Sequence, residues 1–193
     1  MAERITKKIC LRITRWNHLN DIHRSNHIFL DDFMRKIYLA SSWKNSEKIR
    51  SLAIILRKNG HQVFDFTDDS GRQNGLDTYV FNARKLFGNS FYEMNHKEFL
   101  AKSETKRAFL SDKAGIDWCD TLILVLPCGN SSHIEAGYAK GKRKELIIYG
   151  NLPKGSFDTM YGFSEEIFFE DELDHLIEHL LIPVECTLFF DYW

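Results

Sequence analysis

The sequence predicts an α/β fold of three layers, in which helices cover both faces of a mostly parallel, five-stranded sheet. Short apolar runs alternate along the chain with segments of helical periodicity, which is the pattern of right-handed βαβ units. The run at 121–126 is continuously apolar, as expected for a parallel strand buried on both faces. A chain of 193 residues is long enough for one domain with a substantial core.

The first half of the predicted domain begins with a strand at 36–40, followed by a polar turn at 41–46. A helix comes next and ends near Asn59, and a second strand covers 61–66. The helix is predicted from apolar residues at the spacing i, i+3, i+4 and i+7, which are Ile49, Leu52, Ala53 and Leu56.

The second half contains a helix at about 103–117, the buried strand at 121–126 and a short helix at 132–141. Two further strands are expected at 145–150 and 166–170. A closing helix is predicted from one apolar stripe formed by Leu173, Leu176, Ile177, Leu180 and Leu181.

Two segments fall outside this alternating pattern. Residues 67–102 are polar and aromatic without a clean period, and a loop of that length is usually a lid or a binding element. Residues 1–33 carry six Lys or Arg, four Asp or Glu and three His, again without a period. We therefore expect an N-terminal extension at 1–33 and a single domain at 34–193.

Composition narrows the class of protein. The formal net charge of -1 excludes a strong global field for nucleic acid. No apolar run approaches the roughly 20 residues needed to span a bilayer, and basic residues interrupt the first apolar ones, so no signal peptide is predicted.

The four cysteines include no CxxC pair and are expected to be reduced thiols of a cytoplasmic protein. A zinc site from Cys119, Cys128 and His133 matches no known spacing, so no metal or cofactor is predicted.

The turn at 127–132 joins a buried strand to a helix, at the edge of the sheet where ligands of such folds bind. Gly129 permits close approach to the backbone, while Ser131 and Ser132 supply hydroxyl groups beside the free N–H groups of the new helix. This arrangement suits a phosphate. It is equally well explained as a serine N-cap that needs no ligand.

Two carboxylates flank the central strand. Glu135 is expected in the first turn of the helix after that strand, where the macrodipole favours its ionised form. Asp112 shares a predicted helical stripe with Phe109 and Ile116 that should face the sheet, where an unpaired carboxylate is costly. Glu135 is alternatively a surface residue that suits a helix N-terminus. Asp112 is alternatively a helix cap or the partner of Lys113 or Arg107 in an ion pair.

A pair of carboxyl groups at the carboxyl end of one strand is what glycosidic chemistry requires. One group attacks or stabilises the anomeric carbon, and the other handles the proton on the leaving group.

The segments "IYLASSW", "DKAGIDWCDTLILVLP" and "GNSSHIEAGYAKGK" resemble the nucleoside 2-deoxyribosyltransferase family, including the related 2′-deoxynucleoside 5′-phosphate N-hydrolases. The resemblance covers roughly residues 36–161 in three separated motifs that occur in the right order. It implies a flavodoxin-like (Rossmann-like) sheet, a homodimer or larger homo-oligomer, and a covalent glycosyl–enzyme intermediate.

The resemblance also implies roles for individual residues. Glu135 resembles the nucleophile, Asp112 the carboxylate that engages the base and assists proton transfer, and Tyr38 the tyrosine whose hydroxyl orients the nucleophile. More weakly, Asp158 and Met160 in "FDTMYGF" resemble a segment that a neighbouring subunit lends to the site.

The chain departs from the family at one position. The nucleoside-specific transferases carry an acidic residue six positions before the nucleophile, where this chain has Gly129. A Gly/Ser turn suits a 5′-phosphate that a carboxylate would repel, so the departure favours a nucleotide substrate. The predicted substrate- or phosphate-binding residues are Ser41, Ser42, Gly129, Asn130, Ser131 and Ser132.

The leading hypothesis is therefore an enzyme, either a pentosyltransferase or an N-glycosyl hydrolase, that acts on the N-glycosidic bond of a (deoxy)nucleoside or a nucleoside 5′-monophosphate. One alternative is a non-catalytic nucleotide-binding or sensor module on the same fold. Another is a glycohydrolase of NAD or a ribonucleotide that acts as a toxin or defence effector. The sequence leaves open the base and the sugar, transfer or hydrolysis, and a role in salvage, sanitation or defence.

Overall fold

The computed structural model describes residues 34–187, without the side chains of Glu185 and Cys186. All of these residues belong to the unit that begins at Met34. The predicted extension at 1–33 lies outside the described residues and remains a prediction. No helix among the described residues has both the length and the apolar character that crossing a bilayer requires.

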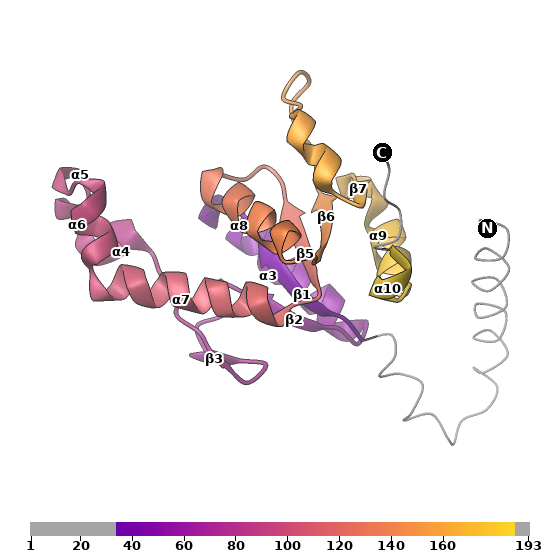
Figure 1. The fold of residues 1–193 in the computed structure, drawn as a ribbon, viewed down its shortest axis with the longest axis horizontal. Helices are drawn as coiled ribbons and strands as arrows, with labels where there is room; N and C mark the ends of the chain where they lie inside the picture. Colours follow the sequence, from indigo (N-terminus) through magenta and orange to yellow (C-terminus); the bar gives the residue numbers. More distant parts are fainter. Residues whose placement is uncertain (1–33, 188–193) are drawn as a thin grey trace, which may run out of the picture. The chain divides into compact units, whose positions relative to one another are not determined.

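The core of the fold is a five-stranded sheet in which all neighbouring strands are parallel (Figure 1). Its order, β2-β1-β5-β6-β7, is the flavodoxin-like order once the strands are renumbered without the small hairpin. The predicted three-layer α/β fold is thus confirmed. The strands are β1 (Lys36–Ala40), β2 (Gln62–Asp65), β5 (Thr121–Val125), β6 (Glu145–Tyr149) and β7 (Glu166–Phe168).

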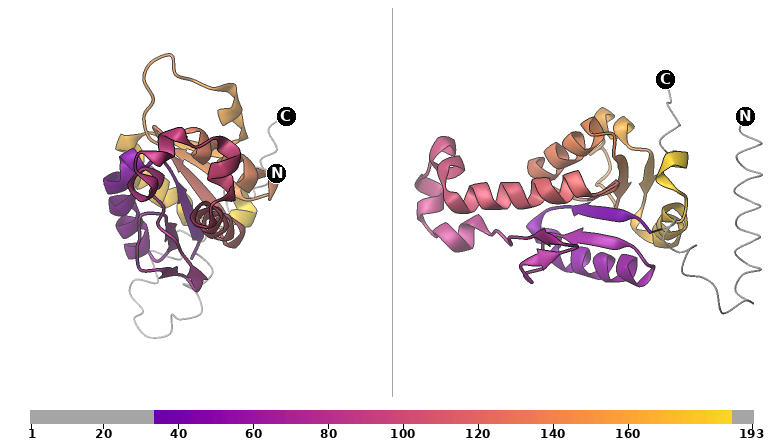
Figure 2. Two further views of the ribbon diagram at one scale, coloured as in Figure 1. Left: turned by 90° about the vertical axis from the view of Figure 1, so that its left-hand side faces the viewer. Right: turned by 60° about the horizontal axis from the view of Figure 1, so that its bottom comes forward.

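Two pairs of longer helices cover the sheet. On one face, α3 (Ser46–Lys58) and α9 (Leu173–Leu180) pack against the apolar cluster that includes Ile37, Ile123 and Ile147. On the other face, α8 (Asn130–Gly141) and the second half of α7 (Ser103–Trp118) pack against the cluster built around Tyr38, Leu122 and Leu124. The right-hand view of Figure 2 shows α3 and α7 on opposite sides of the strands.

The helical stripes read from the sequence are largely confirmed. All four apolar residues predicted for the first helix are buried on α3, and Asn59 is its C-cap. On α9, Leu176 and Leu180 are fully buried, whereas Leu181 lies just beyond the end of the helix and is partly exposed.

The prediction of a long loop at 67–102 is wrong. The segment folds into a hairpin and three short helices, and four phenylalanine rings among them, Phe81, Phe87, Phe91 and Phe99, contact one another. Helices of four to six residues are too short to show a period, which is why the sequence did not reveal them. The elements are β3 (Arg72–Gln73), β4 (Leu76–Asp77), α4 (Ala83–Phe87), α5 (Ser90–Glu93) and α6 (His96–Ala101).

Two helical predictions need correction. The buried stripe of α7 consists of Thr105, Ala108, Ser111, Gly115 and Ile116, and it does not include Phe109, which is 64% exposed. The first half of α7 runs past the strands toward α4–α6, so its residues have no sheet to face (Figure 1). The helix α8 begins at Asn130, two residues earlier than predicted, which places Glu135 in its second turn.

The remaining elements are short and lie between or after the main ones. They are the 3₁₀ helices η2 (Trp43–Asn45), η3 (Thr159–Phe163) and η4 (Glu170–Glu172), and the helix α10 (Val184–Thr187).

Candidate active site

The strand order reverses direction between β1 and β5, and the turns that follow these two strands are joined by hydrogen bonds. The Asn45 side-chain amide donates to the carbonyl of Pro127 at 2.7 Å and to the Ser41 hydroxyl at 3.0 Å. Ser41 in turn donates to the carbonyl of Val125 at 2.8 Å. The Ser42 hydroxyl accepts from the N–H of Lys44 at the start of η2. Both predicted substrate-binding serines therefore make bonds that shape the first turn.

The structure brings all three predicted catalytic residues into one neighbourhood, although each comes from a different element. Tyr38 lies in the middle of β1, Asp112 on α7 and Glu135 on α8, and both helices pack on β1. Tyr38 is buried and stacks on Phe64 of β2, with ring centroids 5.2 Å apart. The charges of Asp112 and Glu135 both act on the Tyr38 hydroxyl and help to raise its pKa, after the larger effect of burial.

Gly115 is what permits α7 to approach the sheet so closely. A Cβ atom at this position would lie 2.9 Å from the rings of both Phe64 and Tyr38, closer than packed carbon atoms can come. The glycine lies about one turn after Asp112 on the same helix, so the close approach that it permits also brings this part of α7 toward Tyr38.

The two carboxyl groups are held in an environment that resists their ionisation. Burial raises the pKa of Asp112 to about 7. Burial and, next, the charge of Asp112 raise the pKa of Glu135 to about 8. Glu135 lies in the second turn of α8 and not, as expected, in the first, so the helix dipole favours its ionised form less than was expected.

The structural alternatives for Asp112 are not realised. Within residues 34–187 its carboxyl group makes no hydrogen bond and no ion pair, and it caps no helix. Lys113 instead pairs with Asp117, and the Arg107 guanidinium lies 4.5 Å from the ring centroid of Tyr79. A partly buried carboxyl group without a partner is costly to the fold and is typical of a functional site.

A shallow depression, too narrow to hold a water molecule as the side chains stand, lies beside Asp112. Phe64 and Tyr79 form its aromatic walls, and Ser111 and Thr78 contribute hydroxyl groups. The Ser111 hydroxyl accepts from the N–H of Tyr79 at 3.1 Å, which ties the wall to α7. The Thr78 hydroxyl is buried and has no hydrogen-bond partner among residues 34–187. A ligand could enter here only if the surrounding side chains moved apart.

The N-terminus of α8 is open to an anion. Its N-cap is Gly129, with no side chain bonded to the first turn, so the alternative of a serine N-cap is wrong. Asn130 and Ser131 are exposed in this turn, whereas Ser132 is only 2% exposed and points to a packing role. The free N–H groups and the dipole of a 12-residue helix favour a negatively charged ligand here.

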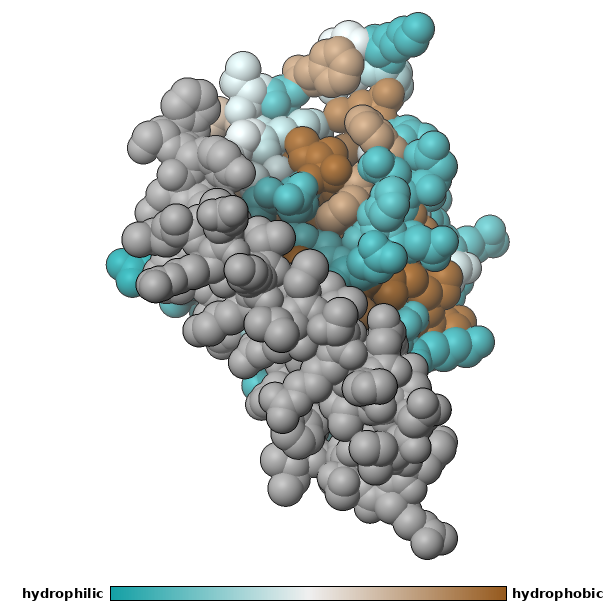
Figure 3. Space-filling view, turned by 90° about the vertical axis from the view of Figure 1, so that its right-hand side faces the viewer, coloured by the Kyte–Doolittle hydropathy of each residue, from teal (hydrophilic) through white to brown (hydrophobic). Residues whose placement is uncertain are grey.

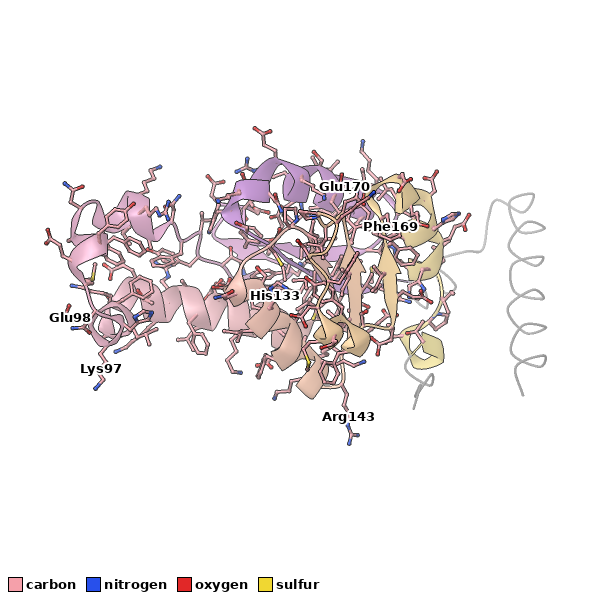
Figure 4. All side chains as sticks on the ribbon, turned by 90° about the horizontal axis from the view of Figure 1, so that it is seen from above. Lys97, Glu98, His133, Arg143, Phe169 and Glu170 are labelled. Carbon is pink, nitrogen blue, oxygen red and sulfur yellow. The ribbon has the colours of Figure 1, made fainter. Side chains whose placement is uncertain are left out.

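Three residues beside this turn were not predicted as a group. His133 Nδ1 lies 2.9 Å from the carbonyl oxygen of Gly129, to which it can only donate, and Nε2 lies 3.2 Å from the Tyr161 hydroxyl oxygen. Figure 4 labels His133 on α8. The Cys128 sulfur lies 3.6 Å from Nδ1, and burial followed by the charge of Glu135 raises the pKa of this thiol to about 11. The three residues attach η3 to the start of α8. The sequence signal for this contact was weak because Tyr161 is 28 residues from His133.

The remaining predicted residues lie elsewhere or carry other contacts. The Asp158 carboxylate accepts from the N–H of Met160 at 2.8 Å and caps η3, and both residues are exposed. Cys119 is buried in the core, where its thiol donates to the carbonyl of Ile116. Among residues 34–187 no group of three or more His, Cys, Asp or Glu side chains is placed to hold a metal ion.

Comparison with known proteins finds likeness in structure only. A search with protein-family models finds no match, and neither does a search of curated proteins. Among solved structures, the chain is similar to the Clostridium botulinum CMP N-glycosidase BcmB, with 15% identity and a TM-score of 0.42 over 76% of this chain and 98% of that one. It is also similar to a conserved protein from Enterococcus faecalis, with 14% identity and a TM-score of 0.44 over 79% and 98% of the two chains. Similarities at this level carry no argument about the reaction, so we argue the function from the side chains.

Proposed function

We propose that the protein is an enzyme that cleaves the N-glycosidic bond of a nucleoside 5′-monophosphate, or transfers its sugar, through a glycosyl–Glu135 intermediate. The observation that carries the proposal is the pair formed by Asp112 and Glu135. These two carboxyl groups come from different helices, act on the same tyrosine, have raised pKa values, and make no ion pair among residues 34–187. The CMP N-glycosidase among the similar folds is consistent with the proposal, which does not depend on it.

The positions of Glu135 and Asp112 support the roles that we propose for them. Glu135 lies five residues into α8, which at 1.5 Å per residue is about 7.5 Å from the anion-binding end of the helix. A sugar whose 5′-phosphate occupies that end would therefore present its C1′ near Glu135. Asp112 borders the shallow depression beside Tyr79, and the base would stack there once the side chains that line it move apart.

The reaction then balances as a double displacement. The Glu135 carboxylate bonds to C1′ while the N-glycosidic bond breaks, and the departing electron pair stays on the base, which takes the proton of Asp112. In the second half, water or another base attacks C1′, gives its proton to Asp112 and releases Glu135. Tyr38 would donate its hydroxyl proton in a hydrogen bond to the Glu135 carboxylate and hold it in line with C1′.

The proposal makes a demand on the shared proton. Burial raises the pKa of both Asp112 and Glu135, to about 7 and about 8, so the unliganded pair retains a proton near neutral pH. Cleavage requires a protonated Asp112 beside an ionised Glu135, so the bound substrate must bring about an exchange that leaves the shared proton on Asp112. A phosphate at the start of α8 and a base nitrogen facing Asp112 supply the interactions for this exchange.

Base release from a panel of nucleoside 5′-monophosphates, nucleosides and NAD, followed by chromatography, tests the activity. Glu135→Gln is isosteric and should lower turnover by at least ~10³-fold, as loss of a nucleophile does. With a slow 2′-fluorinated substrate, mass spectrometry should find the sugar attached to a peptide containing Glu135. An adduct on Asp112 would reverse the two roles. Nucleotide binding without any base release would leave the chain a non-catalytic binding module.

A single isosteric change tests the proposed phosphate site. Asn130→Asp places a carboxylate in the exposed first turn of α8, where it suits the helix but repels a phosphate. The Michaelis constant should rise about 10-fold or more for nucleotides and stay unchanged for the matching nucleosides. Asn130→Ala, which shortens the same side chain without adding a charge, is the matched control. An equal effect of Asn130→Asp on both substrates would remove the phosphate from this turn.

A further inference from the structure

The depression beside Asp112 contains a hydroxyl group to which the proposed reaction gives no role. Thr78 lines this depression and is only 5% exposed, and its hydroxyl has no hydrogen-bond partner among residues 34–187. A hydroxyl that is buried without a partner destabilises the fold, because the same group is hydrogen-bonded to water in the unfolded chain. Such a group requires an explanation, and a ligand that completes its hydrogen bonding is one.

Four other buried side-chain atoms also lack a partner in the described part of the chain, but none of their residues lines the depression. Three of these residues directly precede strands, and they are Arg35, His61 and Asp120. Figure 3 views the molecule from the side on which these strands begin, where apolar residues lie among hydrophilic ones. The fourth, Thr105, lies in the first half of α7. Among the described residues, Thr78 is thus the one of the five that borders the candidate site.

The backbone around Thr78 is held in place beside α7. The N–H of Thr78 donates to the Gly71 carbonyl at 3.0 Å, and the next N–H, that of Tyr79, donates to the Ser111 hydroxyl at 3.1 Å. Ser111 directly precedes Asp112 on α7. The Thr78 hydroxyl is free to rotate about its own bond, so a fixed backbone keeps a donor and acceptor next to the proposed general acid.

Two other polar side chains that line the depression are already engaged within the fold. The Gln73 amide accepts from the N–H of Asp65 at 2.9 Å and donates to the carbonyl of the same residue at 2.8 Å. The Asp68 carboxylate accepts from the N–H of Ser70 at 3.0 Å. Apart from the proposed general acid, Thr78 therefore offers the hydrogen-bonding capacity that remains unused here within residues 34–187.

The side chains over the depression can move without breaking the hydrogen bonds that hold the backbone. Residues 78–82 belong to no helix or strand. The ring of Tyr79 lies 4.5 Å from the exposed Arg107 guanidinium and 6.2 Å, between centroids, from the ring of Phe81. A cation–π contact at an exposed site is weak. A base can therefore displace the Tyr79 ring while the N–H of this residue stays bonded to α7.

We propose that Thr78 is a specificity-determining residue whose hydroxyl forms a hydrogen bond with an exocyclic group of the substrate base. The inference rests on the proposed function, which places the base beside Asp112. Because a hydroxyl donates to a carbonyl oxygen and accepts from an amino group, it suits a base that carries either group. A base with hydrogen in that place gains no such bond.

Thr78→Val tests the hydroxyl, because it keeps the shape of the side chain and removes the polar group. Dissociation constants are measured by calorimetry on the full chain carrying Glu135→Gln, so that bound ligands are not turned over. The parent ligands are AMP, IMP, CMP and UMP with their 2′-deoxy forms. Their analogues are the 5′-monophosphates of purine riboside and pyrimidin-2-one riboside, in which hydrogen replaces the amino or carbonyl group.

The chain with Thr78 intact should bind at least one parent ligand roughly 5- to 10-fold more tightly than its analogue, the effect of one net hydrogen bond. Thr78→Val should abolish this preference by weakening the parent and leaving the analogue nearly unchanged. The variant should also melt at or above the temperature of the unsubstituted chain, since it removes a buried hydroxyl without a partner. A lower melting temperature would show that the hydroxyl has a partner in the fold and would overturn the proposal.

Thr105→Val is the matched control, because Thr105 also has a buried hydroxyl without a partner among residues 34–187 but does not line the depression. It should keep the preference for the parent ligand.

The outcomes separate this inference from the proposed reaction. No preference with Thr78 intact, a preference that survives Thr78→Val, or an equal loss for parent and analogue would overturn the role of Thr78, whereas base release by the wild-type chain would still support the reaction. A preference that depends on Thr78 in a chain that releases no base would support the inference and refute the reaction. If none of the ligands binds, both are overturned.

Discussion

Glu145 lies at one end of the sheet, and the pair Asp112 and Glu135 lies toward the other end. All three carboxyl groups are partly or fully buried, but their pKa values are shifted in opposite directions. Glu145, at the start of β6, is fully buried, forms an ion pair with Arg35 and accepts from Thr121 at 2.9 Å. Burial alone would raise the pKa of Glu145, but the hydrogen bond from His179 and the charge of Arg35 lower it to about 2. Asp112 and Glu135 have no such partners among the described residues, and their pKa values are raised.

The comparison shows that pairing, more than burial, separates an anchoring carboxylate from a reactive one. Arg35 also donates to the carbonyls of His179 and Ile182, so the Glu145 network ties β1, β5 and β6 to the end of α9. It stabilises the ionised form and the fold together. Asp112 and Glu135 behave in the opposite way. Because burial disfavours their ionised forms, their ionisation lowers the free energy of unfolding.

The largest effect on stability is expected from Glu145→Gln, which leaves the Arg35 guanidinium buried without its counter-ion. The free energy of unfolding should fall by about 3–5 kcal/mol at pH 7, as measured by urea denaturation. Because the pKa of Glu145 is lowered to about 2, the stability it contributes is present above the unfolded pKa and is lost as the pH falls through about 2. The variant should show a flatter pH dependence there. Glu178→Gln, an exposed neighbour of His179, is the control, and an equal loss in both variants would contradict the buried network.

Neutralising Asp112 or Glu135 should raise the free energy of unfolding at high pH, whereas Glu145→Gln lowers it. The raised pKa values mean that the pair's contribution is fully present below the unfolded pKa and is lost as the pH rises through about 7 to 8. Asp112→Asn and Glu135→Gln should therefore stabilise the fold by about 1–3 kcal/mol at pH 9, after allowance for partial solvent exposure. At pH 4.5 each variant should melt at nearly the wild-type temperature. Destabilisation at pH 9 would show that these carboxylates are anchors like Glu145.

Removing the Tyr38 hydroxyl tests whether it orients Glu135. Tyr38→Phe keeps the stacked ring, so the free energy of unfolding should change by less than about 1 kcal/mol. If the hydroxyl orients Glu135, turnover should fall about 10-fold with little change in the Michaelis constant. The acid limb of the pH–rate profile should also move upward, because the ionised carboxylate loses a donor. Unchanged turnover and an unchanged profile would reduce Tyr38 to a core residue.

The smallest effect is expected from removing residues 1–33. This segment includes neither the residues of the Glu145 network nor Asp112 and Glu135. A chain that begins at Met34 should therefore fold, associate and release base like the full chain. Circular dichroism, sedimentation and the base-release assay check the three properties. Insolubility or loss of association in the shortened chain would show that the segment is structural.

The sequence by itself determined the parallel sheet, because burial on both faces demands continuous apolar runs such as that of β5 and leaves a readable period on α3. It also singled out Asp112 and Glu135 as candidates, because they flank the central strand and lie in the motifs of the resemblance, although the apolar stripe expected around Asp112 does not include Phe109. It did not supply the helices α4–α6, whose four to six residues are too short for a period.

Only the tertiary structure decided which carboxyl groups lack partners. Glu145 has no special signature in the sequence, and its partners Arg35 and His179 are 110 and 34 residues away. The pKa of Glu135 likewise depends on Asp112, which belongs to another helix, and on how closely Gly115 lets that helix approach Tyr38. Local sequence fixes the apolar period of a helix or strand and the residues at which it ends. Charge interactions act across space, between residues far apart in the chain. The Asp112–Glu135 pair and the Glu145 network therefore differ only in the groups that the fold places beside them.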